Sequence, residues 1–383
     1  MSPATVATTT VTTAVNYGYM RKSFYAAGLF WAFYSTGTNA GWEFSNDGTT
    51  WVGAFTSIGA CLYGNRFSIW FDGTYIHYVR FDNFDLFYRR GIPENDGTIT
   101  WSAVEQTVYD GESGDECEFP CIAVDTNGYA WIGVYHDQPD GDDFPVVLKN
   151  DNNDGTWATD FAYELKVNLD SASWRVAPVP LTDGKVYVVY CESGSTPFGK
   201  LYDAGWGAEE NDLADYSIED GWGFSAGAIG DNVHFVYNRD VTYQIRHNER
   251  VWGVGWDAAD VLVQDTMSNS TGPVLSVDPS TGDLYCFWAL SVDDHVYYRR
   301  YTGAAWQARV DWIDETVDDI PYDDRISSFY MDYGGYIGLL YVTKVASPYN
   351  VRFAFLTMAA PPPPGGMGAK PPIMELLLTG VLG

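Results

Sequence analysis

The chain has 383 residues, of which 46% are hydrophobic and 16% aromatic, so it can bury a large core. Fifty-one acidic residues against 21 basic ones give a formal net charge of −30, which repels nucleic acid and anionic lipid headgroups. Since no apolar run approaches the roughly 18 residues of a membrane-spanning helix, we expect no membrane span and no nucleic-acid partner.

The chain begins with a β-branched segment, residues 5–17, that has no partner run beside it. Seven hairpins follow, and each places a turn glycine between two short apolar or alternating runs. These glycines are Gly28, Gly73, Gly128, Gly184, Gly230, Gly282 and Gly334. Each hairpin is followed by a third run, such as 86–90 or 296–300, and in most repeats by a polar turn and a fourth run.

Tryptophans mark the same repeat at steps of 50, 56, 49, 50 and 50 residues: Trp51, Trp101, Trp157, Trp206, Trp256 and Trp306. Four short strands in about 50 residues are typical of a β-propeller blade, which buries both sheet faces by stacking on its neighbours. The sequence therefore predicts an all-β, seven-bladed propeller of four-stranded blades over residues 1–358. A six-bladed ring is the alternative if the first or last unit is not a full blade.

The seventh repeat ends after its third run, at 353–357, and lacks an outer strand. We expect residues 5–17 to supply that strand and to close the last blade, because closure removes two exposed sheet edges.

The chain ends with a Pro- and Gly-rich tether at 359–372 and an apolar peptide, IMELLLTGVLG, at 373–383. Exposing three consecutive leucines to water is unfavourable. We expect 373–383 to be a docking peptide that attaches the protein to a larger assembly, with a free tail or a tail folded back on the propeller as alternatives.

The turn at 45–51, SNDGTTW, resembles the Asp-box of the sialidase-like (BNR) propeller group, with Ser45, Asp47, Gly48 and Trp51 at the motif positions. The turn at 95–101, NDGTITW, is a degenerate relative with Asp96, Gly97 and Trp101. The resemblance implies a structural turn between the third and fourth strands of a blade, away from the ligand-binding channel. Sialidases proper carry their first catalytic arginine in an Arg-Ile-Pro sequence, which is absent from this chain, so no catalytic residue is carried over.

Four arginines occupy matching places ahead of the turn glycines: Arg21, Arg66, Arg175 and Arg325. Those places are the starts of inner strands, at the mouth of the channel. The four guanidinium groups are therefore candidate ligand-binding groups for a carboxylate or sulfate. The alternative is that they pair with acidic residues of neighbouring blades, such as Asp323 and Asp324.

The sequence indicates no cofactor and no fixed metal site. The five histidines have no metal-ligand spacing, and a loosely bound calcium ion near Asp140, Asp142, Asp143 or Asp154 is the one alternative. The odd number of cysteines argues against a disulfide framework.

Three functions fit these features. The first is a non-catalytic propeller for glycan or receptor recognition or for surface assembly, since abundant Trp and Tyr suit sugar stacking. The second is a sialidase-like glycoside hydrolase, and the third is a purely structural scaffold. The first residues show no secretory signal, so we expect a location on a virion or cell exterior, with a cytoplasmic location as the alternative.

Overall fold

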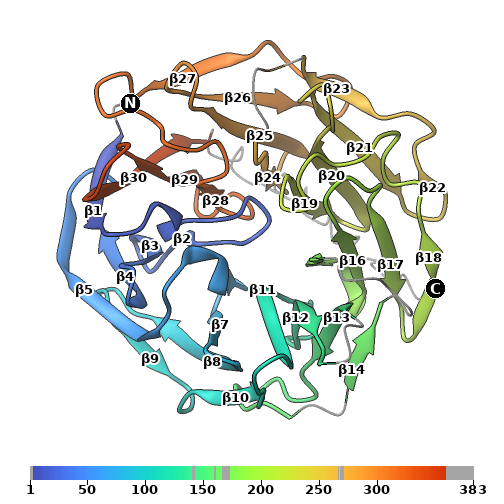
Figure 1. The fold of residues 1–383 in the computed structure, drawn as a ribbon, viewed down its shortest axis with the longest axis horizontal. Helices are drawn as coiled ribbons and strands as arrows, with labels where there is room; N and C mark the ends of the chain where they lie inside the picture. The colour runs from blue at the N-terminus through green and yellow to red at the C-terminus, as the bar shows by residue number, and fades with distance from the viewer. Residues whose placement is uncertain are drawn as a thin grey trace, which may run out of the picture.

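The protein is an all-β propeller with seven blades around a central axis (Figure 1). The computed structural model describes residues 3–139, 143–158, 161–165, 173–265, 267 and 271–358. Each blade has four antiparallel strands, or five where the outer strand is split in two. The predicted fold class is confirmed, and the six-bladed alternative is wrong.

Within each of blades 1 to 6, the strands follow one another in sequence from the axis outwards. Blade 1 contains β2 (Ser23–Ala26), β3 (Leu29–Ser35), β4 (Asn39–Ser45) and β5 (Trp51–Ala60). Blade 2 contains β6 (Phe67–Phe71), β7 (Ile76–Asp82) and β8 (Asp85–Pro93), with β9 (Ile99–Trp101) and β10 (Gln106–Tyr109) both paired to β8. Blade 3 contains β11 (Glu116–Val124), β12 (Ala130–Asp137), β13 (Phe144–Lys149) and β14 (Phe161–Glu164).

The remaining blades repeat the pattern. Blade 4 contains β15 (Arg175–Pro180), β16 (Val186–Cys191), β17 (Phe198–Tyr202) and β18 (Trp206–Glu210). Blade 5 contains β19 (Phe224–Ile229), β20 (Asn232–Asn238) and β21 (Ile245–Val251), with β22 (Gly255–Trp256) and β23 (Val261–Gln264) paired to β21. Blade 6 contains β24 (Val274–Asp278), β25 (Asp283–Leu290), β26 (His295–Tyr301) and β27 (Val310–Asp314). Blade 7 contains β28 (Ile326–Ser328), β29 (Tyr336–Thr343), β30 (Tyr349–Thr357) and, as its outer strand, β1 (Ala4–Thr9).

The second strands carry most of the core. All residues of β3 and β16 are buried, because both faces of these sheets are covered by neighbouring blades. The outer strand β18 is instead mostly exposed or half-buried. This gradient explains why second strands such as β16 read as continuous apolar runs, whereas the outer strand β18 is mostly polar after its first residue, Trp206.

The ring has two faces. On the face that we call the turn face, the inner hairpins turn at the seven predicted glycines, all of which have positive φ, such as +98° at Gly73. On the other, the connecting face, loops join one blade to the next and the inner strands begin. A residue is thereby assigned to a mouth of the channel by its place along its strand.

The last blade is closed by the N-terminal strand. β1 pairs antiparallel with β30 from Ala4 opposite Phe353 to Thr9 opposite Tyr349. The closing strand is shorter than the predicted 5–17, because the chain must turn inwards after Thr9 to reach the inner strand of blade 1. A single turn of 3-10 helix, η1 (Thr12–Ala14), begins that inward path.

The tether at 359–372 and the apolar peptide at 373–383 lie outside the described residues. Helical structure in the part of the chain that the structure describes consists of η1, η2 (Gly64–Arg66) and η3 (Thr182–Gly184). None of these helices is long and apolar enough to cross a membrane.

Candidate functional site at the mouth of a closed channel

The chain itself fills the centre of the ring. Residues 14–22, which we call the axial segment, are all at least nine-tenths buried. Its backbone carbonyls accept hydrogen bonds from three different blades: Ser225 Oγ donates to Gly18 O at 3.3 Å, Cys121 Sγ to Tyr19 O at 3.4 Å and Ser327 Oγ to Met20 O at 2.9 Å. A segment that touches blades 3, 5 and 7 lies on the axis, so the channel is closed.

A pocket of about 370 Å³ lies on the connecting face, beside the axial segment. It is lined by Tyr17, Trp222, Ser291, Tyr322, Asp323, Asp324 and Arg325. These residues come from the axial segment and from loops of blades 4 to 7. A concave site with aromatic walls and a few converging polar groups is the arrangement typical of small-ligand sites, and we name it the connecting-face pocket.

Aromatic rings form one side of this pocket. The Trp222 and Tyr17 rings stack at a centroid distance of 5.6 Å and an interplanar angle of 8°. Tyr17 is buried, whereas Tyr322 is 51% exposed. The stack holds Trp222 rigid, and Tyr322 presents an apolar ring to solvent at the rim.

Charged groups form the other side. Asp324 and Arg325 make an ion pair, and the Arg325 guanidinium also lies 4.9 Å from the centroid of the Tyr322 ring. Burial raises the pKa of Asp324 to about 6, although Arg325 opposes that shift. Burial also raises the pKa of Asp323, whose carboxylate accepts a hydrogen bond from the Ser291 amide. The pocket thus holds two carboxyl groups against one guanidinium.

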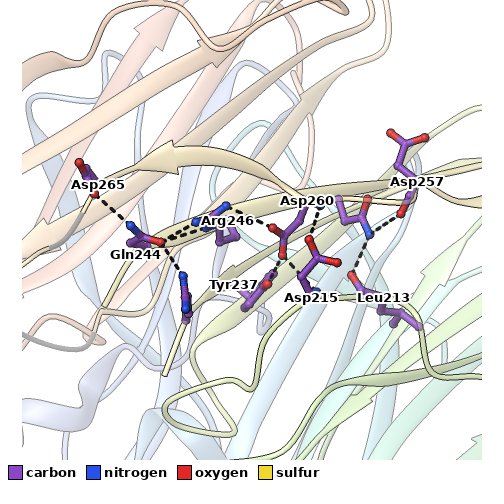
Figure 2. Close-up of polar contacts among 10 residues, drawn as sticks. Leu213, Asp215, Tyr237, Gln244, Arg246, Asp257, Asp260 and Asp265 are labelled. Atoms are coloured by element: carbon purple, nitrogen blue, oxygen red, sulfur yellow. Dashed lines mark hydrogen bonds and ion pairs between the residues drawn. The ribbon is translucent and has the colours of Figure 1, made fainter. Parts of the chain in front are cut away.

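A polar network fixes the loop that carries Trp222 (Figure 2). The amides of Asp215 and Asp260 donate to each other's carboxylates at 3.2 and 3.0 Å. Asp260 also accepts from Tyr237 and pairs with Arg246 at 3.3 Å, which ties the loop after β18 to blade 5. These groups bond to one another, and the network holds Asp215, which lies in the same interblade loop as Trp222, against blade 5.

The four predicted arginines lie where the register places them, at the starts of inner strands: Arg21 before β2, Arg66 before β6, Arg175 at the start of β15 and Arg325 before β28. Their side chains lie in three different surroundings. Of the four, Arg325 is the one that lines the connecting-face pocket.

Arg21 is a structural group. It is 4% exposed, and it donates to Ser328 Oγ, Ser225 Oγ and Ala226 O, each at 3.2 Å. Burial lowers the pKa of Arg21. The side chain therefore joins the axial segment to blades 5 and 7 and is shielded from any ligand in solution.

Arg66 and Arg175 lie against aromatic rings. The Arg175 guanidinium lies 3.6 Å from the ring centroid of Phe119, and the Arg66 guanidinium lies 5.0 Å from that of Phe81. Both act on Glu118, whose pKa is raised by burial and lowered in part by these two positive charges. They form a second electrostatic group, between blades 2 and 4.

The residues that resemble an Asp-box hold the turn between the third and fourth strands of blade 1. Asp47 Oδ1 accepts from the amides of Thr49 and Thr50 at 2.8 and 2.6 Å, and Ser45 Oγ accepts from the amide of Gly48 at 2.9 Å. The Trp51 ring packs edge-on against Phe353 at 5.1 Å. These contacts are consistent with a structural role for the motif.

The degenerate copy in blade 2 has the same design. Asp96 Oδ1 accepts from the amide of Thr98 at 3.0 Å, and Gly97 has a φ of +84°. Trp101 packs edge-on against Trp42 at 6.3 Å. Both turns fix the outer edge of a blade and take no part in the pocket.

The calcium alternative finds no support in the described residues, among which no group of three or more His, Cys, Asp or Glu side chains could hold a metal ion. Asp140 and Asp142 lie outside the described residues. Asp143 accepts a hydrogen bond from Tyr135, and Asp154 caps a turn through Thr156. All five cysteines are buried and free.

Sequence reasoning missed the aromatic half of the pocket. Asp323 and Asp324 stood out as possible partners of the arginines, but Tyr17, Trp222 and Tyr322 did not. The sequence offered no signal for Trp222, because nine of the 15 tryptophans fall outside the 50-residue series and several of these lie in blade strands.

Comparison with known proteins agrees with the architecture. The lectin BP39L from Burkholderia pseudomallei matches with a TM-score of 0.67 at 10% identity, over 90% of this chain and 99% of its own. The polysaccharide lyase Uly1 matches with a TM-score of 0.57 at 9% identity, over 89% and 90% of the two chains. A polysaccharide lyase of the ulvan lyase family PL25, bound to -[GlcA(1-4)Rha3S]-, matches with a TM-score of 0.52 at 12% identity, over 92% and 96%. No family model and no curated sequence matches the chain. At such low identities, these structures show that the chain is similar to lectins and lyases in its propeller fold.

Proposed function

We propose that this protein is a non-catalytic propeller that recognises a glycan in the connecting-face pocket. The observation that carries the proposal is the juxtaposition of the Tyr322 and Trp222 rings with the Asp324–Arg325 pair in one 370 Å³ cavity. Sugars present an apolar C–H face that packs on aromatic rings and hydroxyls that pair with carboxylates and guanidinium groups. The fold that this chain shares with a lectin supports the same function.

The charge of the pocket points to a neutral sugar or an amino sugar. Two carboxyl groups face one guanidinium, in a protein of net charge −30. A uronate, sialate or sulfate would meet repulsion from Asp323 and Asp324, whereas hydroxyl or ammonium groups would find acceptors. We therefore favour these ligands over the carboxylate or sulfate that the arginines alone suggested.

A glycan array with the intact protein tests the ligand class, and titration calorimetry with the best sugar tests the site. Tyr322→Ala is expected to weaken binding roughly tenfold, which corresponds to about 1.4 kcal/mol, within the range for an aromatic contact. Tyr63→Ala is the matched control, since Tyr63 is also exposed on the connecting face, at 41%. Equal affinity of the two variants would place the site elsewhere, and turnover of the bound sugar would contradict the non-catalytic role.

The same proposal includes a location on a virion or cell exterior, where glycans are presented. The assembly role predicted for residues 373–383 is an alternative to the docking inferred below, and one experiment separates the two.

A further inference from the structure

A second pocket, of about 350 Å³, lies at the opposite mouth of the channel. It is formed by the ends of the inner strands and the inner turns of blades 2, 3, 4, 5 and 7. Its apolar walls include Trp70, Phe71, Leu181, Tyr330, Met331 and Tyr333. We name it the turn-face pocket.

The carboxylates of this pocket are occupied within their own turns. Asp72 Oδ1 accepts from the amides of Thr74 and Tyr75 at 2.8 and 2.7 Å, and its Oδ2 lies 3.1 Å from His77 Nε2. Asp125 likewise accepts from backbone amides and, at 3.0 Å, from Trp131 Nε1.

The tyrosine hydroxyls of the pocket are also used. Tyr333 donates to Phe71 O at 3.1 Å, and Tyr330 accepts from the amide of Ala228 at 3.0 Å. What remains for a ligand is mainly ring surface and aliphatic surface. The pocket therefore suits apolar side chains, in contrast to the charged connecting-face pocket.

The described chain ends on this same face. β30 pairs with β29 so that Thr357, its last residue, lies opposite Tyr336, the first residue of β29. The next residue, Met358, donates its amide to Gly335 O at 2.8 Å. Gly335 belongs to the turn that follows the pocket residue Tyr333, so the C-terminal tail starts beside the pocket.

The tail is long enough and has the right chemistry to fill it. Residues 359–372 span up to about 40 Å when extended at ~3.1 Å per residue, whereas β30 and the inner strand β28 are about 10 Å apart, two strand spacings. The peptide 373–383 carries three consecutive leucines, an isoleucine and a methionine, with Glu375 as its one charged side chain. A short tether also gives the peptide a local concentration on the order of millimolar at the pocket.

We infer that residues 373–383 dock in the turn-face pocket of their own propeller, with the leucines on the Trp70, Met331 and Tyr333 surface. This contact removes the leucines from water, together with the apolar surface that the pocket still exposes. It is independent of the glycan proposal, because the axial segment separates the two mouths.

Hydrogen exchange of the full chain tests the inference. Changing Leu376, Leu377 and Leu378 together to Ser is expected to raise amide exchange in residues 71–75 and 330–335 roughly tenfold, as expected when a contact populated about 90% of the time is lost. Met331→Glu, which adds a charge to the pocket, is expected to have the same effect. Leu62→Glu, at an exposed leucine on the connecting face, is the control and should leave exchange at the pocket unchanged.

Size-exclusion chromatography of the same proteins shows whether the peptide that fills the pocket comes from the same chain or from a second copy. A monomer whose pocket is protected by its own tail supports the inference. Unchanged exchange in both tail and pocket variants would overturn it, and so would a tail that pairs two copies or protects the pocket only when another protein is added. Glycan binding should be the same in Met331→Glu and in the unaltered chain, so a failure of docking is distinguishable from a failure of the glycan proposal.

Discussion

Lys22 gives the sharpest test of the packing at the axis. Its side chain is completely buried, its Nζ donates to the carbonyl oxygen of Phe67, and it lies 4.2 Å from the centroid of the Phe67 ring. Burial lowers the pKa of Lys22 from 10.5 to about 7. Among the residues that the structure describes, no carboxylate offsets this burial, so the charged form would lie in the core without an acidic partner there.

The lowered pKa of Lys22 makes the free energy of unfolding depend on pH. Between pH 7 and 10.5, the unfolded chain binds a proton at Lys22 that the folded chain releases, so the free energy of unfolding rises with pH in this window. At pH 7 the folded state is destabilised by about 4 kcal/mol relative to a lysine with an unshifted pKa. Lys22→Met removes this cost but also removes a hydrogen bond worth about 1 kcal/mol.

We therefore expect Lys22→Met to be more stable than the unaltered protein by roughly 3 kcal/mol at pH 7 and slightly less stable near pH 10.5. Urea unfolding of both proteins at several pH values measures the difference between their free energies of unfolding. Titration of the groups that both proteins share cancels in this difference. Lys200→Met, at a partly exposed lysine of β17, is the control and should show no such crossover. A difference that stays constant from pH 7 to 10.5 would refute the reasoning.

Two further predictions concern the turns and the closure of the ring. Gly97→Ala should lower the free energy of unfolding by about 2–4 kcal/mol, because a Cβ there would lie 2.0 Å from Phe44 Cε1. Gly73 also has a positive φ but has open space around it, so Gly73→Ala should lower the free energy of unfolding by only about 1 kcal/mol. Chemical denaturation measures both losses, and equal losses would contradict the steric argument. Deleting residues 1–9 removes β1 and exposes the edge of β30, so we expect the melting temperature to fall by about 5 °C or more and aggregation to increase, whereas deleting residues 1–3 should change neither in calorimetry and light scattering.

The ring could be predicted from sequence because its physical causes are local. A glycine with positive φ is required at each inner turn, and an alternating or continuously apolar run follows it, so seven such signals identify seven blades. The missing outer strand of the last blade could also be predicted, because the seventh repeat has only three runs. The length of the strand that replaces it could not be predicted, because the chain turns inwards after Thr9 to reach the first blade.

The pocket could be predicted only in part, because its residues meet through the ring geometry. Register alone placed Arg325 at a channel mouth, and it also placed the adjacent Asp323 and Asp324 there. Tyr17 and Trp222 are 205 residues apart in sequence and stack only because the axial segment crosses the centre. No local pattern distinguishes a segment that closes a channel from one that continues a strand.

The closed channel has a consequence for specificity. In an open propeller, a ligand at one mouth can contact residues along the whole axis, so that its two ends are recognised together. Here Ser225, Cys121 and Ser327 hold the axial segment between the two pockets, and a ligand in one pocket cannot reach the other. The charged connecting-face pocket and the apolar turn-face pocket can therefore bind unrelated partners. When Tyr322→Ala and Met331→Glu are combined, the changes in glycan affinity and in amide exchange at the turn-face pocket should be those of the two single variants. A measurable coupling between them would require the axial segment to move.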